Sequence, residues 1–400
     1  MSLGEKFLHR LMERAENTWA KTNIPSASIL FSEKGCPEYF AIKKATDKQD
    51  FHGVLLHAQS QEAILIDWDI NAGFQNQVKR VTLVDEVKLA SLLRITPRWE
   101  VIFKITKSFS PHLTQFPILE SIIDAWRNGR KPRSLGISDE GKILDALKTI
   151  NHCRALEQQD IPIRRMSARL GFDTKRLEAI TSALDLLTSG ELNGLPRDKE
   201  EIFAELGLVK HPSPILIAGC LSVHISSEDE IYIPNPYLGL PPSSVTDIKI
   251  KDHCRVIISI ENLTTFHELA LLNQADVVLI YSNGMPSPSW RKFYGMLIRN
   301  APSHCEIYHW GDVDAGGYRI AKNIFNTAKL NGRGMKLHSM NPNHLPHQYH
   351  LRKLENNEIL EMQKNAILCG WDQEYLGIAI SPYAFEQEIL NLSIPLLALT

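Results

Sequence analysis

A regular alternation of strand-like and helix-like segments in residues 255–328 most constrains the fold of this 400-residue chain. Strand-like runs occupy residues 255–260, 276–281 and 305–310, and helix-like stretches follow them at 265–273, 289–299 and 318–328. The first run is almost continuously apolar, as expected for a strand that is covered on both faces of a parallel sheet. Three repeats of strand and helix therefore predict a doubly wound α/β domain.

Three carboxylates follow these predicted strands. Glu261 comes directly after the first strand, and Asp312 and Asp314 lie two residues apart after the third. Since ligands of open parallel sheets bind beyond the carboxyl ends of the strands, we expect the three side chains to meet there. Their charges need neutralising, which indicates Mg²⁺ or Mn²⁺, hard cations that prefer oxygen ligands. Gly316 and Gly317, which open the following helix, could offer backbone N–H groups to a phosphate.

The alternative interpretation is that these acids cap helices or face water. A bare D-x-D motif would favour that alternative, but a strand-end Glu combined with G-D-x-D-x-x-G favours a metal site. In the acidic C-terminal region, Glu386 and Glu388 could supply a further metal ligand, although a solvated helix face explains them more simply. His309, His267 and Trp310 lie near the predicted site and are interpreted as structural.

Residues 1–130 are interpreted as an N-terminal arm that is structural or binds a partner, since they contain no catalytic motif. Apolar spacing predicts a helix over residues 3–20. Residues 63–66 and 99–105 are predicted to form strands. The segment 127–133, which contains Gly and Pro and lacks a large apolar residue, marks a domain boundary.

Residues 131–235 are predicted to form a winged-helix DNA-binding domain, and residues 236–400 the α/β domain. Helices are expected over 143–156, 165–170 and 174–187, with Gly171 in the turn and Asp173 or Thr174 capping the last helix. The strand-rich segment 215–233 would suit the wing. A plain helical hairpin with solvated basic residues is the alternative.

The whole-chain net charge of −2 gives no sign of a nucleic-acid partner, but basic residues cluster locally. Lys175 and Arg176 would lie in the first turn of the second helix, where recognition helices reach DNA. The predicted DNA contacts are Arg164, Arg165, Lys175, Arg176, Arg130 and Lys131, with support from Arg127 and Arg133. DNA would therefore meet the middle of the chain.

The cysteines, the apolar runs and the lack of a nucleotide-binding motif exclude several classes of protein. Six cysteines without a C-x-x-C pair imply neither a disulfide scaffold nor a zinc ribbon. No apolar run approaches the roughly 20 residues of a membrane helix, and no basic flank leads into an apolar signal segment. We therefore expect a cytoplasmic protein with no membrane partner. No P-loop motif occurs, so ATP turnover would have to come from a partner.

Three motifs carry a family resemblance. Glu261-Asn262-Leu263-Thr264-Thr265-Phe266, Asn283-Gly284-Met285-Pro286-Ser287 and His309-Trp310-Gly311-Asp312-Val313-Asp314-Ala315-Gly316-Gly317 resemble the JetD family, the Toprim nuclease subunit of the Wadjet plasmid-defence system. Residues 170–178 resemble the winged-helix motif of that family. The Toprim domain is shared by topoisomerases, bacterial primases and related nucleases.

The resemblance implies a metal-dependent endonuclease that cleaves double-stranded plasmid DNA. It implies a homodimer recruited by an SMC-type ATPase complex. Glu261 would be a metal ligand or general base, and Asp312 and Asp314 would hold Mg²⁺ or Mn²⁺ against the scissile phosphate.

The family is similar in layout to the A subunit of topoisomerase VI, which cuts DNA through a tyrosine on its winged helix. All ten tyrosines of this chain lie at position 39 or at 232 and beyond, so hydrolysis by a metal-bound water is the expected route. Two alternatives stay open. One is a haloacid-dehalogenase-like phosphohydrolase, whose D-x-D normally follows the first strand of its domain. The other is an inactive DNA-binding Toprim protein.

Overall fold

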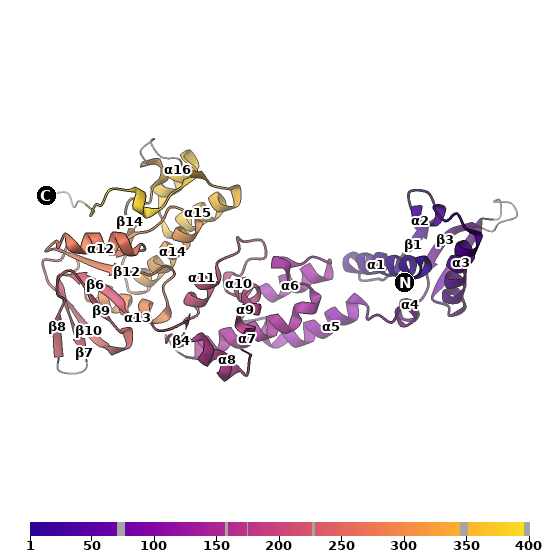
Figure 1. Cartoon of the computed structure of the whole chain (residues 1–400), viewed down its shortest axis with the longest axis horizontal. Coiled ribbons are helices and arrows are strands. Elements are labelled where there is room, and N and C mark those ends of the chain that lie inside the picture. Colours follow the sequence, from indigo (N-terminus) through magenta and orange to yellow (C-terminus); the bar gives the residue numbers. More distant parts are fainter. Residues whose placement is uncertain (70–76, 157–158, 174, 226–228, 345–350, 396–400) are drawn as a thin grey trace. The chain divides into compact units, whose positions relative to one another are not determined.

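Figure 1 shows the computed structural model of the chain, which describes residues 1–69, 77–156, 159–173, 175–225, 229–344 and 351–395. The chain divides into two compact units. The first comprises residues 1–144 with 190–192, and the second comprises residues 145–189 with 193–400. This confirms a mixed α/β, multidomain architecture, while the three domain ranges given above stay a prediction. None of the described helices is long and apolar enough to cross a membrane.

The first unit is built around a three-stranded antiparallel sheet in the order β1-β3-β2. Its strands are β1 (Ser28–Leu30), β2 (Ile64–Asp69) and β3 (Gln77–Leu83). Aromatic and aliphatic side chains form its core, where Phe7 and Phe51 lie 5.7 Å apart between ring centroids. The helices of this unit are α1 (Leu3–Thr22), α2 (Pro37–Phe40), α3 (Ala45–Ser60), α4 (Glu86–Leu93), α5 (Arg98–Phe109) and α6 (Ile118–Arg127), with 3₁₀ turns η1 (Ser110–His112), η2 (Pro132–Ser134) and η3 (Ile137–Asp139).

Two of the three elements predicted in this region are confirmed, namely the helix α1 and the strand β2. The strand predicted over residues 99–105 is wrong, because α5 covers that segment as a helix. Its buried residues Ile102, Ile105 and Phe109 follow one another at intervals of three and four. This helical spacing places them on one face, and burial of that face outweighs the weak strand preference of the local sequence.

Short helices occupy residues 140–205, as predicted in outline: α7 (Glu140–Ala155), α8 (Ile163–Leu170), α9 (Arg176–Ala179), α10 (Thr181–Ser189) and α11 (Lys199–Glu205). Gly171 ends α8 in the left-handed conformation, with φ +72°, as a sharp turn requires. The single helix predicted over 174–187 is instead interrupted at Ile180. Asp173 does not cap a helix there, since its carboxylate accepts the Lys175 N–H at 2.8 Å in a local turn. Thr174, the other predicted cap, lies outside the described residues.

The segment 215–233 is rich in strands, but its assignment to a wing is wrong. It forms β6 (Ile215–Gly219), β7 (Leu221–Ile225) and β8 (Asp229–Tyr232). Strand β6 pairs with β12 (Val277–Tyr281), and β7 pairs with β10 (Val245–Ile250). Pairing with a strand from the C-terminal region buries the apolar face of β6, so tertiary contacts decide where the segment belongs.

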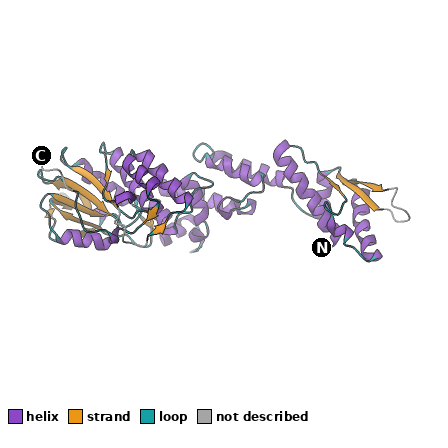
Figure 2. Ribbon diagram, turned by 90° about the horizontal axis from the view of Figure 1, so that it is seen from above, coloured by secondary structure: helices purple, strands orange, loops and turns teal. Residues whose placement is uncertain are grey.

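The second unit contains a six-stranded sheet in the order β14-β13-β11-β12-β6-β9. Strands β11 (Val256–Ile260), β12, β13 (Glu306–Trp310) and β14 (Lys336–Leu337) are parallel, and β6 and β9 (Leu238–Leu240) extend the sheet in antiparallel pairing. All five residues of β11 are buried, as the apolar run predicted. Figure 2 shows this sheet enclosed by helices.

Helices connect the parallel strands in two directions. α12 (Leu263–Leu271) leads from β11 to β12 on one side, and α14 (Ala315–Leu330) leads from β13 to β14 on the other. α13 (Pro288–Arg299) returns across β11. Because such crossovers are right-handed, opposite directions put helices on opposite faces, which confirms the doubly wound pattern. The remaining elements are β4 (Ile161–Pro162), β5 (Leu208–Val209), α15 (Asn356–Cys369), α16 (Asp372–Ile380), β15 (Arg352–Lys353), β16 (Tyr383–Ala384), η4 (Pro242–Ser244), η5 (Pro342–His344) and η6 (Gln387–Ile389).

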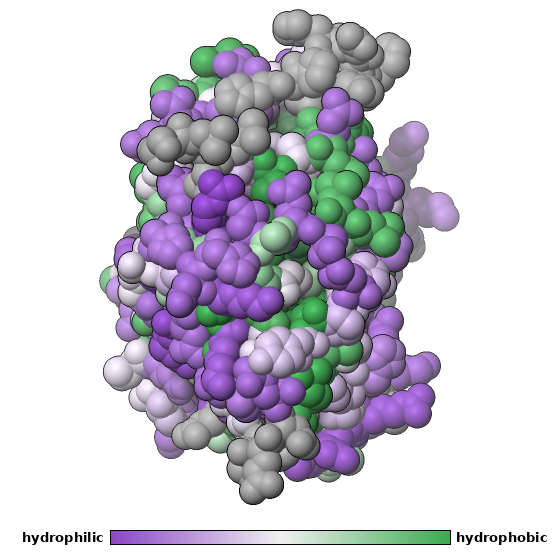
Figure 3. Space-filling view, turned by 90° about the vertical axis from the view of Figure 1, so that its left-hand side faces the viewer, coloured by the Kyte–Doolittle hydropathy of each residue, from purple (hydrophilic) through white to green (hydrophobic). Residues whose placement is uncertain are grey.

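The surface in Figure 3 is mainly hydrophilic, and its hydrophobic side chains gather in a band. Among the exposed apolar residues of the second unit, Leu263, Leu271 and Leu272 belong to α12 or follow it directly. The predicted homodimer is not tested by this surface and stays a prediction.

Candidate functional site

The candidate site lies where β11 and β13 end side by side. These strands are parallel neighbours, with Ile260 opposite Trp310. Beyond the last pair, the Glu261 N–H donates to the Trp310 carbonyl at 3.0 Å. The chain leaves β11 and β13 in opposite directions at this point, so the ends of the two strands form the crevice that doubly wound sheets use for ligands.

Glu261 and Asp312 lie next to each other, in contact through the Asp312 backbone, while the meeting of all three carboxylates stays a prediction. The Asp312 N–H donates to Glu261 Oε2 at 3.4 Å. Gly311 makes room for this contact, because a Cβ at that position would lie 2.4 Å from Glu261 Oε2. The absence of a side chain at Gly311 is therefore required by the position of the Glu261 carboxylate.

Asp314 begins α14. Its carboxylate accepts the Gly317 N–H at 2.7 Å, which is an N-cap hydrogen bond. A Cβ at Gly317 would lie 2.1 Å from the Asp312 carbonyl oxygen, so the loop closes tightly only with glycine there. The prediction that the Gly317 N–H is available to a phosphate is wrong, because Asp314 occupies it.

The C-terminal segment 385–388 completes the site. Phe385 pairs with Val313 in an antiparallel bridge. The Gln387 N–H then donates to Asp312 Oδ1 at 2.7 Å, and the Gln387 side-chain carbonyl accepts the Asn262 N–H at 3.0 Å. The sequence analysis missed Gln387, since an amide 75 residues from Asp312 carries no local signal.

The two predicted additional acids differ in position. The Glu386 charge raises the pKa of both Asp312 and Glu261. Glu388 instead accepts a hydrogen bond from Asn262 Nδ2 at 2.7 Å. Of the two, Glu386 is the one close to the acidic cluster of Glu261, Asp312 and Asp314.

Burial and like charges perturb the acids of this cluster. Desolvation of the buried carboxyl is the main cause that raises the pKa of Glu261 to about 8, and the charges of Asp312 and Asp314 are the next largest. Removal from water also raises the pKa of Asp312 to about 7, and the nearby Glu386 and Asp314 charges add to the rise while the Gln387 N–H opposes it. Without a cation, burial and mutual repulsion therefore disfavour the charged forms of Glu261 and Asp312.

The donor chemistry of this cluster fits a hard divalent cation, since every candidate ligand is a carboxylate. Among the described residues, however, no three His, Cys, Asp or Glu side chains already surround one point as metal ligands do. Repulsion between the carboxylates opposes such convergence when no cation lies between them. Cation binding would have to draw Glu261 and the two aspartates closer together.

Two of the three residues interpreted as structural are deeply buried, whereas His267 is exposed. His309 is fully enclosed, and its Nδ1 lies 2.9 Å from Ser259 Oγ. Removal from water lowers the pKa of His309 to about 3, so the ring is neutral at physiological pH. Trp310 is also completely buried. His267 contacts the ring of Tyr237.

The predicted DNA contacts fall into two groups. Arg164, Arg165 and Lys175 are exposed in the second unit. Arg176 is less free, because its Nη2 lies 2.6 Å from Asp145 Oδ2. In the first unit, Lys131 is exposed, whereas Arg130 pairs with Asp124 at 3.2 Å. Their role in DNA binding stays a prediction.

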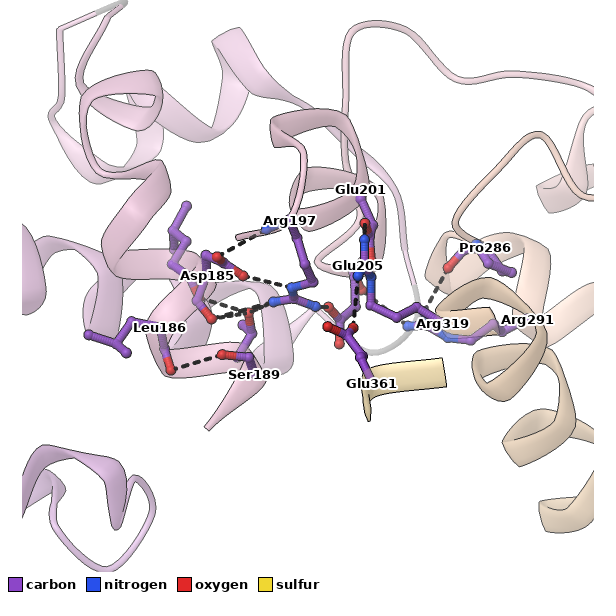
Figure 4. A network of polar contacts seen from close by, with 12 residues as sticks. Asp185, Leu186, Ser189, Arg197, Glu201, Glu205, Pro286, Arg291, Arg319 and Glu361 are labelled. Carbon is purple, nitrogen blue, oxygen red and sulfur yellow. Dashed lines mark hydrogen bonds and ion pairs between the residues drawn. The ribbon is translucent and has the colours of Figure 1, made fainter. Parts of the chain in front are cut away.

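A network of ion pairs joins α14 to neighbouring helices (Figure 4). Arg319, in the second turn of α14, binds Glu201 of α11 and Glu361 of α15, each at 2.7 Å. Arg197 similarly binds Asp185 of α10 at 2.7 Å and Glu205 of α11 at 2.6 Å. The helix that carries Asp314 at its N-cap is thereby attached to the short helices that precede the sheet.

The fold and the site define a class of protein. It is an α/β protein with carboxylates at the ends of two adjacent parallel strands, where the connections to the next strands run in opposite directions. Residues 231–391 match the family model described as Wadjet protein JetD, C-terminal. The chain is 25% identical to the Wadjet protein JetD of Bacillus cereus (strain Q1) over 182 residues, which are 44% of each chain. The match thus spans less than half of that relative. The C-terminal part of this chain is therefore similar to the C-terminal region of JetD proteins.

Proposed function

We propose that this protein is a metal-dependent endonuclease that hydrolyses double-stranded plasmid DNA within a Wadjet defence complex. The observation that carries the proposal is the contact between Glu261 and Asp312 at the ends of β11 and β13, in the region that matches the JetD family. Carboxylates are the donor set that hard divalent cations prefer. The winged-helix and Toprim assignments are part of the proposal.

Each acid has a distinct role in this proposal. Asp312 and Asp314 are held by N–H groups of Gln387 and Gly317, so their free oxygens have fixed directions as ligands. Glu261, whose pKa is raised to about 8 in the cation-free site, would be held in its carboxylate form by a nearby cation, and it serves as ligand or general base. A bound Mg²⁺ or Mn²⁺ would lower the pKa of its water and stabilise charge on the scissile phosphate.

The DNA and protein partners follow from the same proposal. Exposed Arg164, Arg165 and Lys175 would contact phosphates, which position DNA without reading its sequence. Homodimer formation would provide one site for each DNA strand. An SMC-type ATPase complex would supply ATP turnover and recruit the nuclease to circular plasmids.

Plasmid cleavage tests this function. The full-length protein is incubated with supercoiled and linear plasmid in Mn²⁺, Mg²⁺ or EDTA, alone and with the other Wadjet subunits. We expect cleavage only with a divalent cation, and its loss in Glu261→Gln and Asp312→Asn. Glu268→Gln is a matched control, because Glu268 is exposed on α12 away from the acidic cluster.

The outcomes separate the alternatives. Cleavage at the wild-type rate by Glu261→Gln and Asp312→Asn would place the chemistry elsewhere. DNA binding without cleavage under every condition would favour the inactive DNA-binding protein. Hydrolysis of small phosphate esters without plasmid cleavage would favour the phosphohydrolase.

A further inference from the structure

Four residues at the site form a closed ring of interactions. The Asp312 N–H donates to Glu261 Oε2 at 3.4 Å, and Glu261 is followed directly by Asn262. The Asn262 N–H donates to the Gln387 side-chain carbonyl at 3.0 Å, and the Gln387 N–H donates to Asp312 Oδ1 at 2.7 Å. Gln387 therefore connects the end of β11 to the end of β13 through its side chain and its backbone at once.

The segment that carries Gln387 is itself well anchored. Val313 and Phe385 exchange two backbone hydrogen bonds, with N–O distances of 2.9 and 3.2 Å. Gln387 follows two residues later and is 1% exposed. Its amide Nε2 is buried and has no hydrogen-bond partner among the described residues. Such burial of a polar amide is costly, which indicates that the position needs its hydrogen-bonding groups for something besides packing.

We propose that Gln387 is a positioning residue that keeps the Glu261 and Asp312 carboxylates near enough for a cation to draw them together. The inference rests on the proposed function. The Glu261 and Asp312 carboxylates repel one another when both are charged. The strand ends therefore need a connection that resists their separation, and this connection is called the tie below. Gln387 provides that tie from outside the sheet, whereas the last bond between the strands themselves is the one from Glu261 N–H to Trp310.

Hydrogen–deuterium exchange tests the tie without any cation or DNA. In Gln387→Met the side chain keeps its length but loses the carbonyl that accepts the Asn262 N–H. We expect faster exchange in peptides that cover residues 259–266 of the full-length protein. Gln387→Glu keeps an acceptor oxygen, so we expect slow exchange to be restored. Gln373→Met is the matched control, because Gln373 is exposed, its backbone carbonyl accepts a hydrogen bond, and its side chain has no hydrogen bond within the described part of the chain.

Mn²⁺ titration by calorimetry provides the second measurement. Residues that orient metal ligands typically account for about 10–100-fold in metal affinity, and we expect a loss of that size in Gln387→Met. Gln373→Met should bind Mn²⁺ as the wild type does, and Gln387→Glu should bind it more tightly than Gln387→Met.

The two measurements separate failure of this inference from failure of the proposed function. If the wild type binds no Mn²⁺ although Gln387→Met loosens residues 259–266, the metal-dependent function fails and the tie itself stands. If the wild type binds Mn²⁺ and Gln387→Met matches it in both affinity and exchange, Gln387 is not a positioning residue. Equal loosening in Gln387→Met and Gln387→Glu would also overturn the inference, because the acceptor oxygen would then be irrelevant.

Discussion

Arg319 binds both carboxylate oxygens of Glu201, with Nε–Oε1 and Nη2–Oε2 distances of 2.7 and 2.9 Å. The two residues are 118 positions apart, yet this pair attaches α14 to α11. Both side chains are largely buried, with exposed fractions of 17% and 10%. A bidentate ion pair of this kind fixes the relative orientation of the two side chains, and a Lys side chain could not form it.

We expect Arg319→Met to destabilise the protein strongly, because it leaves Glu201 and Glu361 without their shared partner. Removing one member of a buried pair typically costs about 3–5 kcal/mol, and urea unfolding monitored by circular dichroism would measure the loss. Arg352→Met is the control: Arg352 is 55% exposed and pairs with Glu358 near the surface, so a loss of about 1 kcal/mol or less is expected. Equal stability of the two variants would contradict this ranking.

The sequence predicted the sheet and the acid pair because both depend on local patterns. The buried strand β11 was visible as an apolar run, and Glu261 and Asp312 were visible as acids at predicted strand ends. Parallel pairing of adjacent strands then brings such residues together. The α/β fold and the contact between these acids are therefore consequences of a pattern that a single sequence displays.

The elements that were missed depend on distant contacts. Strand β6 joins β12 across about 60 residues, and nothing in its own sequence distinguishes that partner from a wing. Likewise, Gln387 reaches Asp312 only because Phe385 pairs with Val313. Local propensity cannot report pairings that arise when remote segments pack together.

A side chain at Gly311 should inactivate the site without unfolding the protein. In Gly311→Ala the new Cβ would lie 2.4 Å from Glu261 Oε2 and 2.9 Å from His309 Nε2, so the Glu261 carboxylate has to move. We expect loss of at least tenfold in plasmid cleavage with a smaller change in melting temperature. Gly53→Ala, in helix α3, is the control. The Cβ added there has no heavy atom within 4 Å, so this variant should leave cleavage unchanged. Cleavage by Gly311→Ala at the control rate would contradict the assigned position of Glu261.

The contribution of Glu261 and Asp312 to the stability of the cation-free protein should fall as the pH rises between about 4 and 8. Folding raises the pKa of Glu261 from 4.5 to about 8 and that of Asp312 from 3.8 to about 7, so these two groups bind more protons in the folded state than in the unfolded chain in this interval. Stability falls with pH wherever the folded state binds more protons. Melting temperatures in EDTA should therefore be higher for Glu261→Gln than for the wild type at pH 8.5, and similar for both at pH 4.5. The same difference at both pH values would show that charge on Glu261 is not its cause.

Cut DNA should carry no covalently attached protein. A phosphotyrosine route needs a phenol as nucleophile and leaving group, and the chain has no tyrosine between positions 40 and 231, which include helices α7–α11. Beyond that interval, Tyr237 packs against the ring of Phe266, and Tyr232 lies on strand β8. We expect all ³²P-labelled DNA ends to migrate freely in denaturing gels without protease treatment. Tyr232→Phe should cleave at the wild-type rate. Label retained on the polypeptide, and lost in one Tyr→Phe variant, would replace hydrolysis by a covalent mechanism.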